Sequence, residues 1–233
     1  MRLKTPKMVL IDLDGTLVDS APDLAFCVDE TLKQLGLPPQ GLERVRDWVG
    51  NGVEKLICRA LTGDIDGTPD PAVLARALPV FLALYDQNIA QRSHLFPGIR
   101  EGMAALRAQG IPLGCVTNKI ARFTEALLQN LGVRQQFGIV VSGDTLPQKK
   151  PHPAPLLHAA HFFGVAPGDS LMVGDSVHDV EAARAAGFQI VCVSYGYNHG
   201  VDIRSAQPDA VIDSLLELPK LFDTSGEWLV ASG

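Results

Sequence analysis

Three aspartates stand at the ends of predicted strands, where carboxylates can bind a metal ion or attack phosphorus. Asp12 and Asp14 close the apolar run 8–13, and Asp175 follows the run 170–173. Ligands of an open parallel α/β sheet lie beyond the carboxyl ends of its strands, so we expect these carboxylates to converge. Oxygen ligands suit Mg²⁺, which shares its coordination shell with phosphate groups. A bound cation would let this acidic edge accept a phosphomonoester.

The spacing of Asp12 and Asp14 suits phosphoryl transfer in two steps. One carboxylate can attack phosphorus and form an aspartyl-phosphate. The second can protonate the leaving oxygen and later take a proton from water. Gly15 lets the chain turn sharply, which would bring Asp14 back over the site. Turn or helix-cap chemistry accounts for Asp14 or Asp175 singly, but not for two aspartates at i and i+2 after a buried strand.

Two further segments offer groups that bind a phosphoryl oxygen. The strand at 112–117 ends in Thr117 and Asn118, whose hydroxyl and amide are suitable donors. Lys150 would neutralise charge that develops on phosphorus, and it directly precedes Pro151 and a predicted helix start. In isolation, Lys149-Lys150 would be interpreted as a solvated basic pair. Its position in the predicted fold favours a role for Lys150.

Strands and helices alternate along most of the chain. Strands are predicted at 8–13, 112–117, 137–142, 170–173, 189–193 and 210–212, and helices at 99–109, 123–131, 154–163 and 180–186. Strands joined by helices of this length form right-handed crossovers and a parallel sheet covered on both faces. The fold class predicted is therefore α/β, with a Rossmann-like parallel sheet as its core.

A helical insertion follows the first strand. Helices are predicted at 20–35, with Ser20 as N-cap and Asp23 in its first turn, and at 53–61 and 74–89. No strand is predicted between residues 18 and 95. We therefore predict an α/β core over 1–17 and 96–222, an α-helical cap over 18–95, and a C-terminal tail over 223–233.

Composition excludes several classes of protein. The 233 residues carry a formal net charge of −6, with a sequence pI near 5.5, which argues against nucleic acid or an anionic membrane as partner. The four cysteines are scattered without metal-ligand spacing, as in reduced cytoplasmic proteins. No secretory signal or membrane-spanning stretch is apparent, so we expect a cytoplasmic protein, either a monomer or a homodimer.

Four motifs, in order, resemble those of the haloacid-dehalogenase-like hydrolases. They are Asp12-Leu13-Asp14-Gly15-Thr16-Leu17-Val18-Asp19-Ser20, Thr117-Asn118, Lys150-Pro151, and Gly174-Asp175-Ser176-Val177-His178-Asp179. The resemblance implies that Asp12 is the nucleophile and Asp14 the general acid/base. It further implies that Mg²⁺ is held by the Asp12 carboxylate, the Asp14 backbone carbonyl and Asp175, while Asp179 supports the metal site or orients Lys150. Because dehalogenases of this family lack an acid/base aspartate at the second position, Asp14 favours phosphoryl transfer.

The segments 46–53 and 149–157 more closely resemble the bacterial phosphoglycolate phosphatases. This resemblance implies a small phosphorylated metabolite, 2-phosphoglycolate, as substrate. In the cap, Arg46 could pair with a substrate carboxylate and Asn51 could offer amide donors, although Arg46 could equally be an exposed helix residue. The alternatives are a phosphatase for another small metabolite such as a sugar phosphate, a phosphomutase, or a binding module that has lost catalysis.

Overall fold

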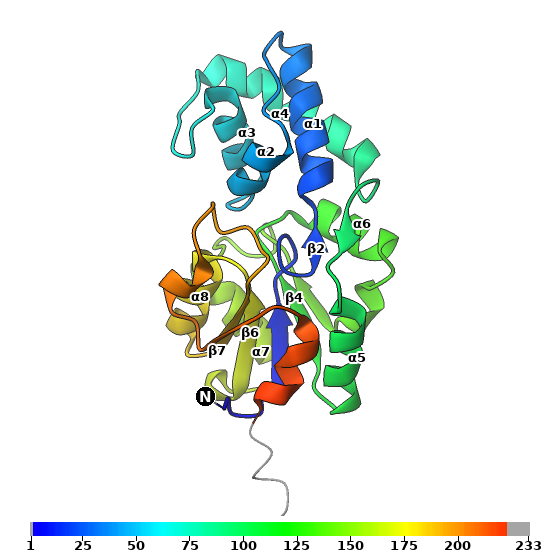
Figure 1. Cartoon of the computed structure of the whole chain (residues 1–233), viewed down its shortest axis with the longest axis vertical. Coiled ribbons are helices and arrows are strands. Elements are labelled where there is room, and N and C mark those ends of the chain that lie inside the picture. Colours follow the sequence, from blue (N-terminus) through cyan, green and yellow to red (C-terminus); the bar gives the residue numbers. More distant parts are fainter. Residues whose placement is uncertain (1, 223–233) are drawn as a thin grey trace, which may run out of the picture.

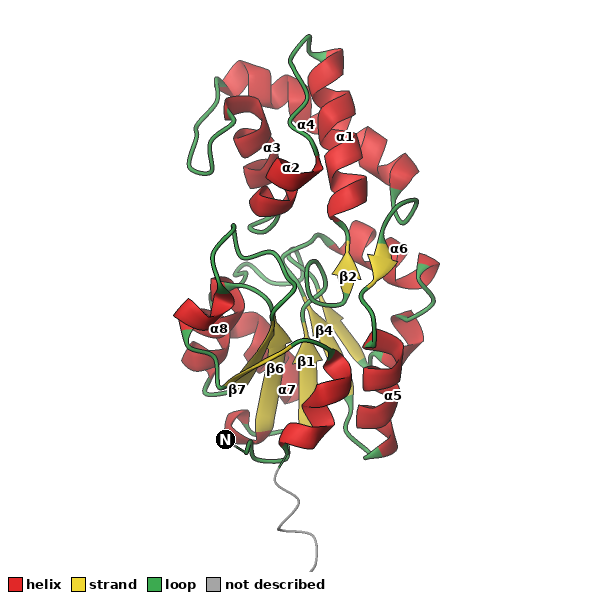
Figure 2. Ribbon diagram, in the orientation of Figure 1, coloured by secondary structure: helices red, strands yellow, loops and turns green. Residues whose placement is uncertain are grey.

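A central parallel sheet organises the chain. The computed structural model describes residues 2–222, and its larger sheet has six strands in the order β5-β4-β1-β6-β7-β8, all pairs parallel (Figures 1 and 2). The strands are β1 (Met8–Ile11), β4 (Leu113–Val116), β5 (Ile139–Val141), β6 (Ser170–Gly174), β7 (Gln189–Val193) and β8 (Ala210–Ile212). The predicted α/β class with a parallel sheet is confirmed.

Helices cover both faces of the sheet. They are α5 (Ile99–Ala108), α6 (Ala121–Asn130), α7 (Ala154–Phe163) and α8 (Val177–Ala186). The fully buried strand β1 shows how this arises, because successive side chains of a strand point to opposite faces. Val9 and Ile11 belong to the apolar cluster that contains residues of α5 and α6, whereas Met8 and Leu10 belong to the cluster that contains residues of α7 and α8. The near-continuous apolar run of β1 is thus typical of a strand buried on both sides.

The position of β1 determines where polar side chains gather. β1 lies between β4 and β6 and is parallel to both. The residues that follow these three strands therefore lie next to one another at the same edge of the sheet.

Four helices lie between β1 and α5 and form a separate layer above that edge (Figures 1 and 2). They are α1 (Ala21–Gln34), α2 (Leu42–Trp48), α3 (Val53–Thr62) and α4 (Pro71–Asn88). Helix α2, seven residues long, is absent from the sequence prediction because so short a helix shows little periodicity. Its Val45 and Trp48 are buried against the other helices.

The two connections to this helical layer pair with each other. β2 (Val18–Asp19) and β3 (His94–Leu95) form a two-residue antiparallel ladder. The prediction that no strand occurs between residues 18 and 95 is therefore wrong at both ends of that segment. A ladder of two residues is too short to show the alternation on which strand prediction depends.

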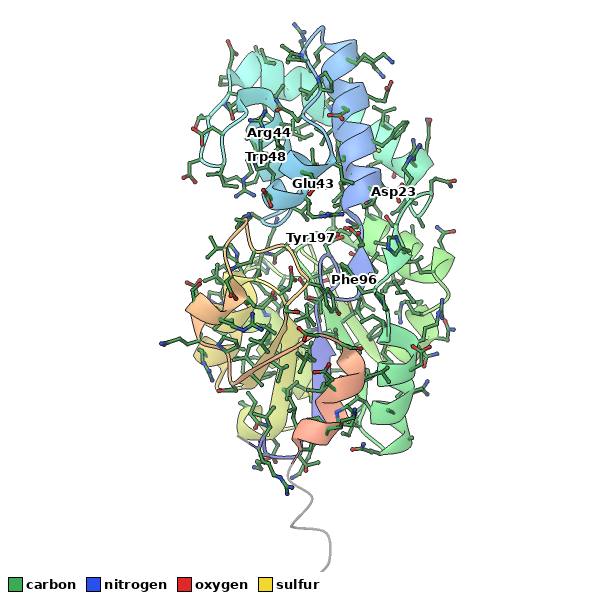
Figure 3. The ribbon with its side chains drawn as sticks, viewed as in Figure 1. Asp23, Glu43, Arg44, Trp48, Phe96 and Tyr197 are labelled. Carbon is green, nitrogen blue, oxygen red and sulfur yellow. The ribbon has the colours of Figure 1, made fainter. Side chains whose placement is uncertain are left out.

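Ser20 and Asp23 begin α1, but their side chains do not cap it. Ser20 is the N-cap residue, yet its hydroxyl donates to Asp14 Oδ1 at 2.5 Å. The fully buried carboxylate of Asp23 accepts hydrogen bonds from the backbone amides of Arg92 and Ser93, at 2.8 and 3.0 Å, and from the Ser93 hydroxyl (Asp23 is labelled in Figure 3). These hydrogen bonds join the start of α1, which follows β2, to the segment that leads into β3.

Some predictions concern the whole chain rather than the site. In the range 2–222, no helix combines the length and apolar character that a membrane crossing requires. The four cysteines are unpaired, with Cys27, Cys115 and Cys192 buried. The C-terminal tail predicted over 223–233 lies outside the described residues.

Candidate active site

The loop after β1 holds the side chains of Asp12 and Asp14 in different positions relative to the sheet. The Asp12 amide donates to the Val173 carbonyl at 2.9 Å, which continues the β1–β6 ladder and keeps the Asp12 side chain at the centre of the sheet edge. The chain then turns at Gly15, whose φ of +85° favours glycine. Asp14 leaves the sheet in this turn, and its carboxylate accepts from Ser20 and from Lys119 Nζ, the latter at 3.0 Å.

Asp175 follows β6 and is almost completely buried. Its Oδ1 accepts from the Thr16 hydroxyl at 2.7 Å, and its Oδ2 accepts from the Tyr197 amide at 2.6 Å. Two glycines make room for this carboxylate. A β-carbon on Gly15 would lie 2.3 Å from Asp175 Oδ2, and one on Gly196 would lie 2.1 Å from Asp175 Cβ.

Lys150 lies between two carboxylates. Its Nζ is 2.8 Å from Asp12 Oδ1 and 2.7 Å from Asp179 Oδ1. Asp179 Oδ2 also accepts from the amide and hydroxyl of Ser176, which completes the capping box at the start of α8. Burial raises the pKa of Asp179, but the charge of Lys150 and these hydrogen bonds outweigh it, so the pKa is lowered. Lys150 is thus in direct contact with the carboxylates of both Asp12 and Asp179.

The acidic cluster fits a divalent cation. Asp12, Asp175 and Asp179 each offer one oxygen, and these oxygens lie within 4.8 Å of one another. Burial raises the pKa of Asp12 to about 7, against the opposing charge of Lys150, and burial also raises the pKa of Asp175. Asp12 Oδ1 is buried and makes no hydrogen bond of normal geometry, despite its proximity to Lys150. Lys150 compensates only part of the charge of three buried carboxylates, and a divalent cation would supply the rest.

Thr117 and Asn118 follow β4 and line the same pocket as Asp12. The Thr117 amide donates to the Val141 carbonyl at 2.9 Å, which fixes this residue at the end of the sheet. Asn118 Nδ2 donates to the backbone carbonyl of Lys150 at 3.0 Å, whereas its Oδ1 is buried without a partner. The Asn118 amide therefore holds the Lys150 loop in place.

The two predicted cap residues lie in different places. Asn51 lines the pocket, accepts from Arg59 Nη2 at 3.0 Å and lies 2.9 Å from His178 Nε2 of the core. Arg46 instead lines a neighbouring cavity, and its Nη2 is 3.3 Å from Asp19 Oδ2. The structure thus places Asn51 in the pocket that contains Asp12 and Asp14, whereas Arg46 lines a cavity that shares Asp175 and Tyr197 with that pocket.

Sequence reasoning assigned no role to Lys119 or Tyr197, which also line the pocket. Burial alone would lower the pKa of Lys119, but the neighbouring Asp14 raises it above the ordinary lysine value. Tyr197 donates its amide to Asp175 and its hydroxyl to Asp19, and Figure 3 shows it where the helical layer meets the sheet layer. The position of Lys119 next to Thr117-Asn118 is a usable signal for its inclusion.

Comparisons relate the chain to known proteins. Residues 9–193 match the family described as haloacid dehalogenase-like hydrolase. A phosphoglycolate phosphatase of Nitrosococcus oceani is 62% identical over 219 residues, which cover 94% of this chain and 97% of that protein. Its counterpart in Nitrosospira multiformis is 50% identical over 219 residues, with coverages of 94% and 96%. A crystal structure described as a predicted phosphoglycolate phosphatase from Haemophilus somnus matches with a TM-score of 0.88 at 35% identity, covering 94% of this chain and 99% of that one.

Proposed function

Since the chain belongs to the haloacid dehalogenase-like hydrolases, we propose that it is a Mg²⁺-dependent phosphatase that hydrolyses 2-phosphoglycolate to glycolate and phosphate. The substrate is supported by relatives that are 62% and 50% identical over nearly the whole chain and carry the name phosphoglycolate phosphatase. The partner of the enzyme is thus a small phosphorylated metabolite.

One arrangement of side chains supports phosphoryl transfer as the class of reaction. Asp12 and Asp179 share Lys150, and Asp12, Asp175 and Asp179 bring oxygens within 4.8 Å of one another. Such a cluster combines a nucleophilic carboxylate with the cationic Lys150 and with oxygen ligands for Mg²⁺, and both cations would attract a phosphate dianion.

Asp12 is proposed as the nucleophile. Its carboxylate oxygen attacks phosphorus, and the bond between phosphorus and the bridging oxygen breaks, leaving an aspartyl-phosphate. The charge of Lys150 opposes the effect of burial on the Asp12 pKa and neutralises negative charge on the phosphoryl oxygens, and the Thr117 hydroxyl donates to one of them. Mg²⁺, when bound by the Asp12 carboxylate, the Asp14 backbone carbonyl and Asp175, supplies positive charge next to the phosphoryl group.

Asp14 is proposed as the general acid and base. In the first step it gives its proton to the bridging oxygen, so that glycolate leaves as an alcohol. In the second step it takes a proton from the water that attacks the aspartyl-phosphate, which restores Asp12 and releases phosphate. Ser20 and Lys119 hold the Asp14 carboxylate in the loop above Asp12.

The helical layer, residues 18–95, is proposed to act as the cap over this chemistry. Its Val49, Val53 and Leu56 line the pocket together with Asn51. Apolar walls exclude water, which strengthens the electrostatic interactions inside. The hydrogen bonds between Asp23 and residues 92–93 link the two segments that connect the helical layer to the core. These segments would therefore move together, as hinge closure requires.

Phosphate release from a panel of phosphorylated metabolites tests the proposal. The panel contains 2-phosphoglycolate, 3-phosphoglycerate, glucose 6-phosphate and glucose 1-phosphate, each assayed with Mg²⁺ and with EDTA. We expect 2-phosphoglycolate to have the highest kcat/KM and EDTA to abolish release. A higher kcat/KM for a sugar phosphate would overturn the substrate, and conversion of glucose 1-phosphate to its isomer without phosphate release would indicate a mutase. Absence of release from every monoester would overturn the reaction class.

A further inference from the structure

Lys119 is a buried cation in the pocket. In the reaction proposed above, its only role is to hold the Asp14 carboxylate in position. It is the third residue of the segment after β4, and 5% of its side chain is exposed. Its Nζ lies 3.0 and 3.3 Å from the two Asp14 carboxylate oxygens. Lys119 Nζ also lies 4.9 Å from the centre of the Tyr85 ring, and the π-face of an aromatic ring attracts a cation.

The other cations near the pocket are engaged elsewhere. Lys150 lies between the carboxylates of Asp12 and Asp179. Arg46 pairs with Asp19 and lines the neighbouring cavity. Lys149 is exposed, with its Nζ beside the backbone of Gly52 at the cap loop. Among the described residues, the one ion pair found for Lys119 is with Asp14.

An ammonium group has three hydrogen-bond donors. Both Asp14 carboxylate oxygens and the Tyr85 ring surround Lys119 Nζ, so a substrate carboxylate would bind Nζ in place of one Asp14 oxygen. The pocket that this ammonium group lines is walled by Leu24, Val49 and Leu56 of the helical layer. Low polarity around a charge strengthens its attraction for an incoming anion.

The contact with Asp14 places Lys119 on the leaving-group side of the reaction. Asp14 protonates the bridging oxygen, so it must lie beside that oxygen in the substrate complex. In 2-phosphoglycolate the carboxylate is attached to the carbon that bears the bridging oxygen. A cation in contact with Asp14 is therefore near the substrate carboxylate, whereas Lys150 is near the phosphoryl group.

From this geometry we propose that Lys119 binds the carboxylate of the substrate and thereby selects phosphate esters whose leaving group carries an adjacent anion. The proposal rests on the proposed function.

The test compares 2-phosphoglycolate with ethyl phosphate, which has the same chain of heavy atoms apart from the carboxylate oxygens. We measure kcat/KM for both esters with the wild-type chain and Lys119→Met. We expect Lys119→Met to lower the ratio of kcat/KM for 2-phosphoglycolate to kcat/KM for ethyl phosphate about 10- to 100-fold, which corresponds to the loss of one charge-assisted hydrogen bond. The kcat/KM for ethyl phosphate itself should fall less. Lys119→Gln, which keeps a donor for Asp14 without the charge, is expected to lower the ratio likewise and replaces the methionine variant if that fails to fold.

Two matched variants serve as controls. Lys149→Met removes an exposed lysine near the same cap loop, and Arg46→Met removes the arginine of the neighbouring cavity. We expect both to leave the ratio within about threefold of wild type, since neither charge lies in the pocket. A drop of the ratio in Arg46→Met alone would overturn the proposal in favour of Arg46.

The outcomes separate this inference from the function on which it rests. If wild type prefers 2-phosphoglycolate strongly and Lys119→Met lowers kcat/KM for both esters to the same extent, Lys119 acts only by positioning Asp14 and the inference is wrong. If wild type shows no preference for 2-phosphoglycolate over ethyl phosphate but hydrolyses monoesters, the proposed substrate itself is wrong.

Discussion

Gly15 lies in close contact with the carboxylate of Asp175. A β-carbon at position 15 would be 2.3 Å from Asp175 Oδ2, and the φ of Gly15 is +85°. We predict that Gly15→Ala displaces this carboxylate and lowers both Mg²⁺ affinity and kcat/KM by at least about tenfold, since a metal ligand would be moved. Isothermal titration with Mg²⁺ and a phosphate-release assay measure the two effects.

Gly36 provides the control for Gly15. It has a φ of +74°, similar to that of Gly15, but a β-carbon there would meet no atom within 4 Å. Gly36→Ala therefore carries the backbone strain alone, about 1–2 kcal/mol of unfolding free energy, and we expect normal kcat/KM. Equal losses of activity in the two alanine variants would show that backbone strain, and not displacement of Asp175, is responsible.

We predict that Asp12→Asn abolishes turnover and leaves the fold intact. The amide cannot attack phosphorus, so phosphate release should fall on the order of 10³-fold or more. Lys150 keeps its contact with Asp179, at 2.7 Å, and the apolar packing of β1 is unchanged. Phosphate release and the far-ultraviolet circular dichroism spectrum are the measurements. Substantial turnover in a variant shown by mass spectrometry to retain asparagine at position 12 would remove Asp12 from its proposed role.

The arrangement of the core residues could be predicted from the sequence because one rule of parallel sheets governs it. Asp12, Thr117 and Asp175 each follow a strand, and the strands β1, β4 and β6 are neighbours. Their meeting at one edge thus follows from the strand assignments alone. Lys150 required the additional observation that it precedes a helix start.

Contacts between loops could not be predicted in this way. Tyr197 reaches Asp175 and Asp19 from a loop after β7, and the sequence contains no periodic signal that sets the path of that loop. Ser20 and Asp23 match a helix-start pattern, but tertiary partners compete for both side chains: Asp14 for Ser20, and residues 92–93 for Asp23. Local patterns predict where α1 begins, and only the fold determines what these side chains bind.

Lys150 is predicted to stabilise the metal-free protein strongly. Its removal in Lys150→Met leaves the buried carboxylates of Asp12 and Asp179 without their cation. We expect a loss of about 3–5 kcal/mol of unfolding free energy, measured by urea denaturation in EDTA. The adjacent, exposed Lys149 is the control, and Lys149→Met should change the value by no more than about 0.5 kcal/mol. Similar stabilities for the two variants would mean that the carboxylates are compensated in another way.

Asp23 is predicted to hold the helical layer to its returning connection. Its fully buried carboxylate accepts hydrogen bonds from two backbone amides, of Arg92 and Ser93, and from the Ser93 hydroxyl. Asp23→Ala leaves these buried donors without an acceptor and should cost about 2–3 kcal/mol of unfolding free energy. Hydrogen exchange of the Arg92 and Ser93 amides should accelerate, and unchanged protection of both would contradict the prediction. The exposed helix cap Asp70, which accepts from the Ala72 amide, is the control, with an expected loss of about 1 kcal/mol in Asp70→Ala.

Binding of Mg²⁺ is predicted to strengthen as pH rises toward neutrality. In the metal-free protein, burial raises the pKa of Asp12 from 3.8 to about 7, so the folded state retains a proton that the unfolded chain has lost. The free energy of unfolding without metal should therefore fall as pH rises from about 4 to about 7. Mg²⁺ must displace that proton, so its dissociation constant, measured by titration calorimetry, should decrease from pH 5.5 to 7 and level off above about pH 7.5. Asp12→Asn removes the titrating group, and its remaining Mg²⁺ affinity should depend less on pH. A dissociation constant of the wild-type chain that stays constant across this range would show that Asp12 is already ionised at pH 5.5.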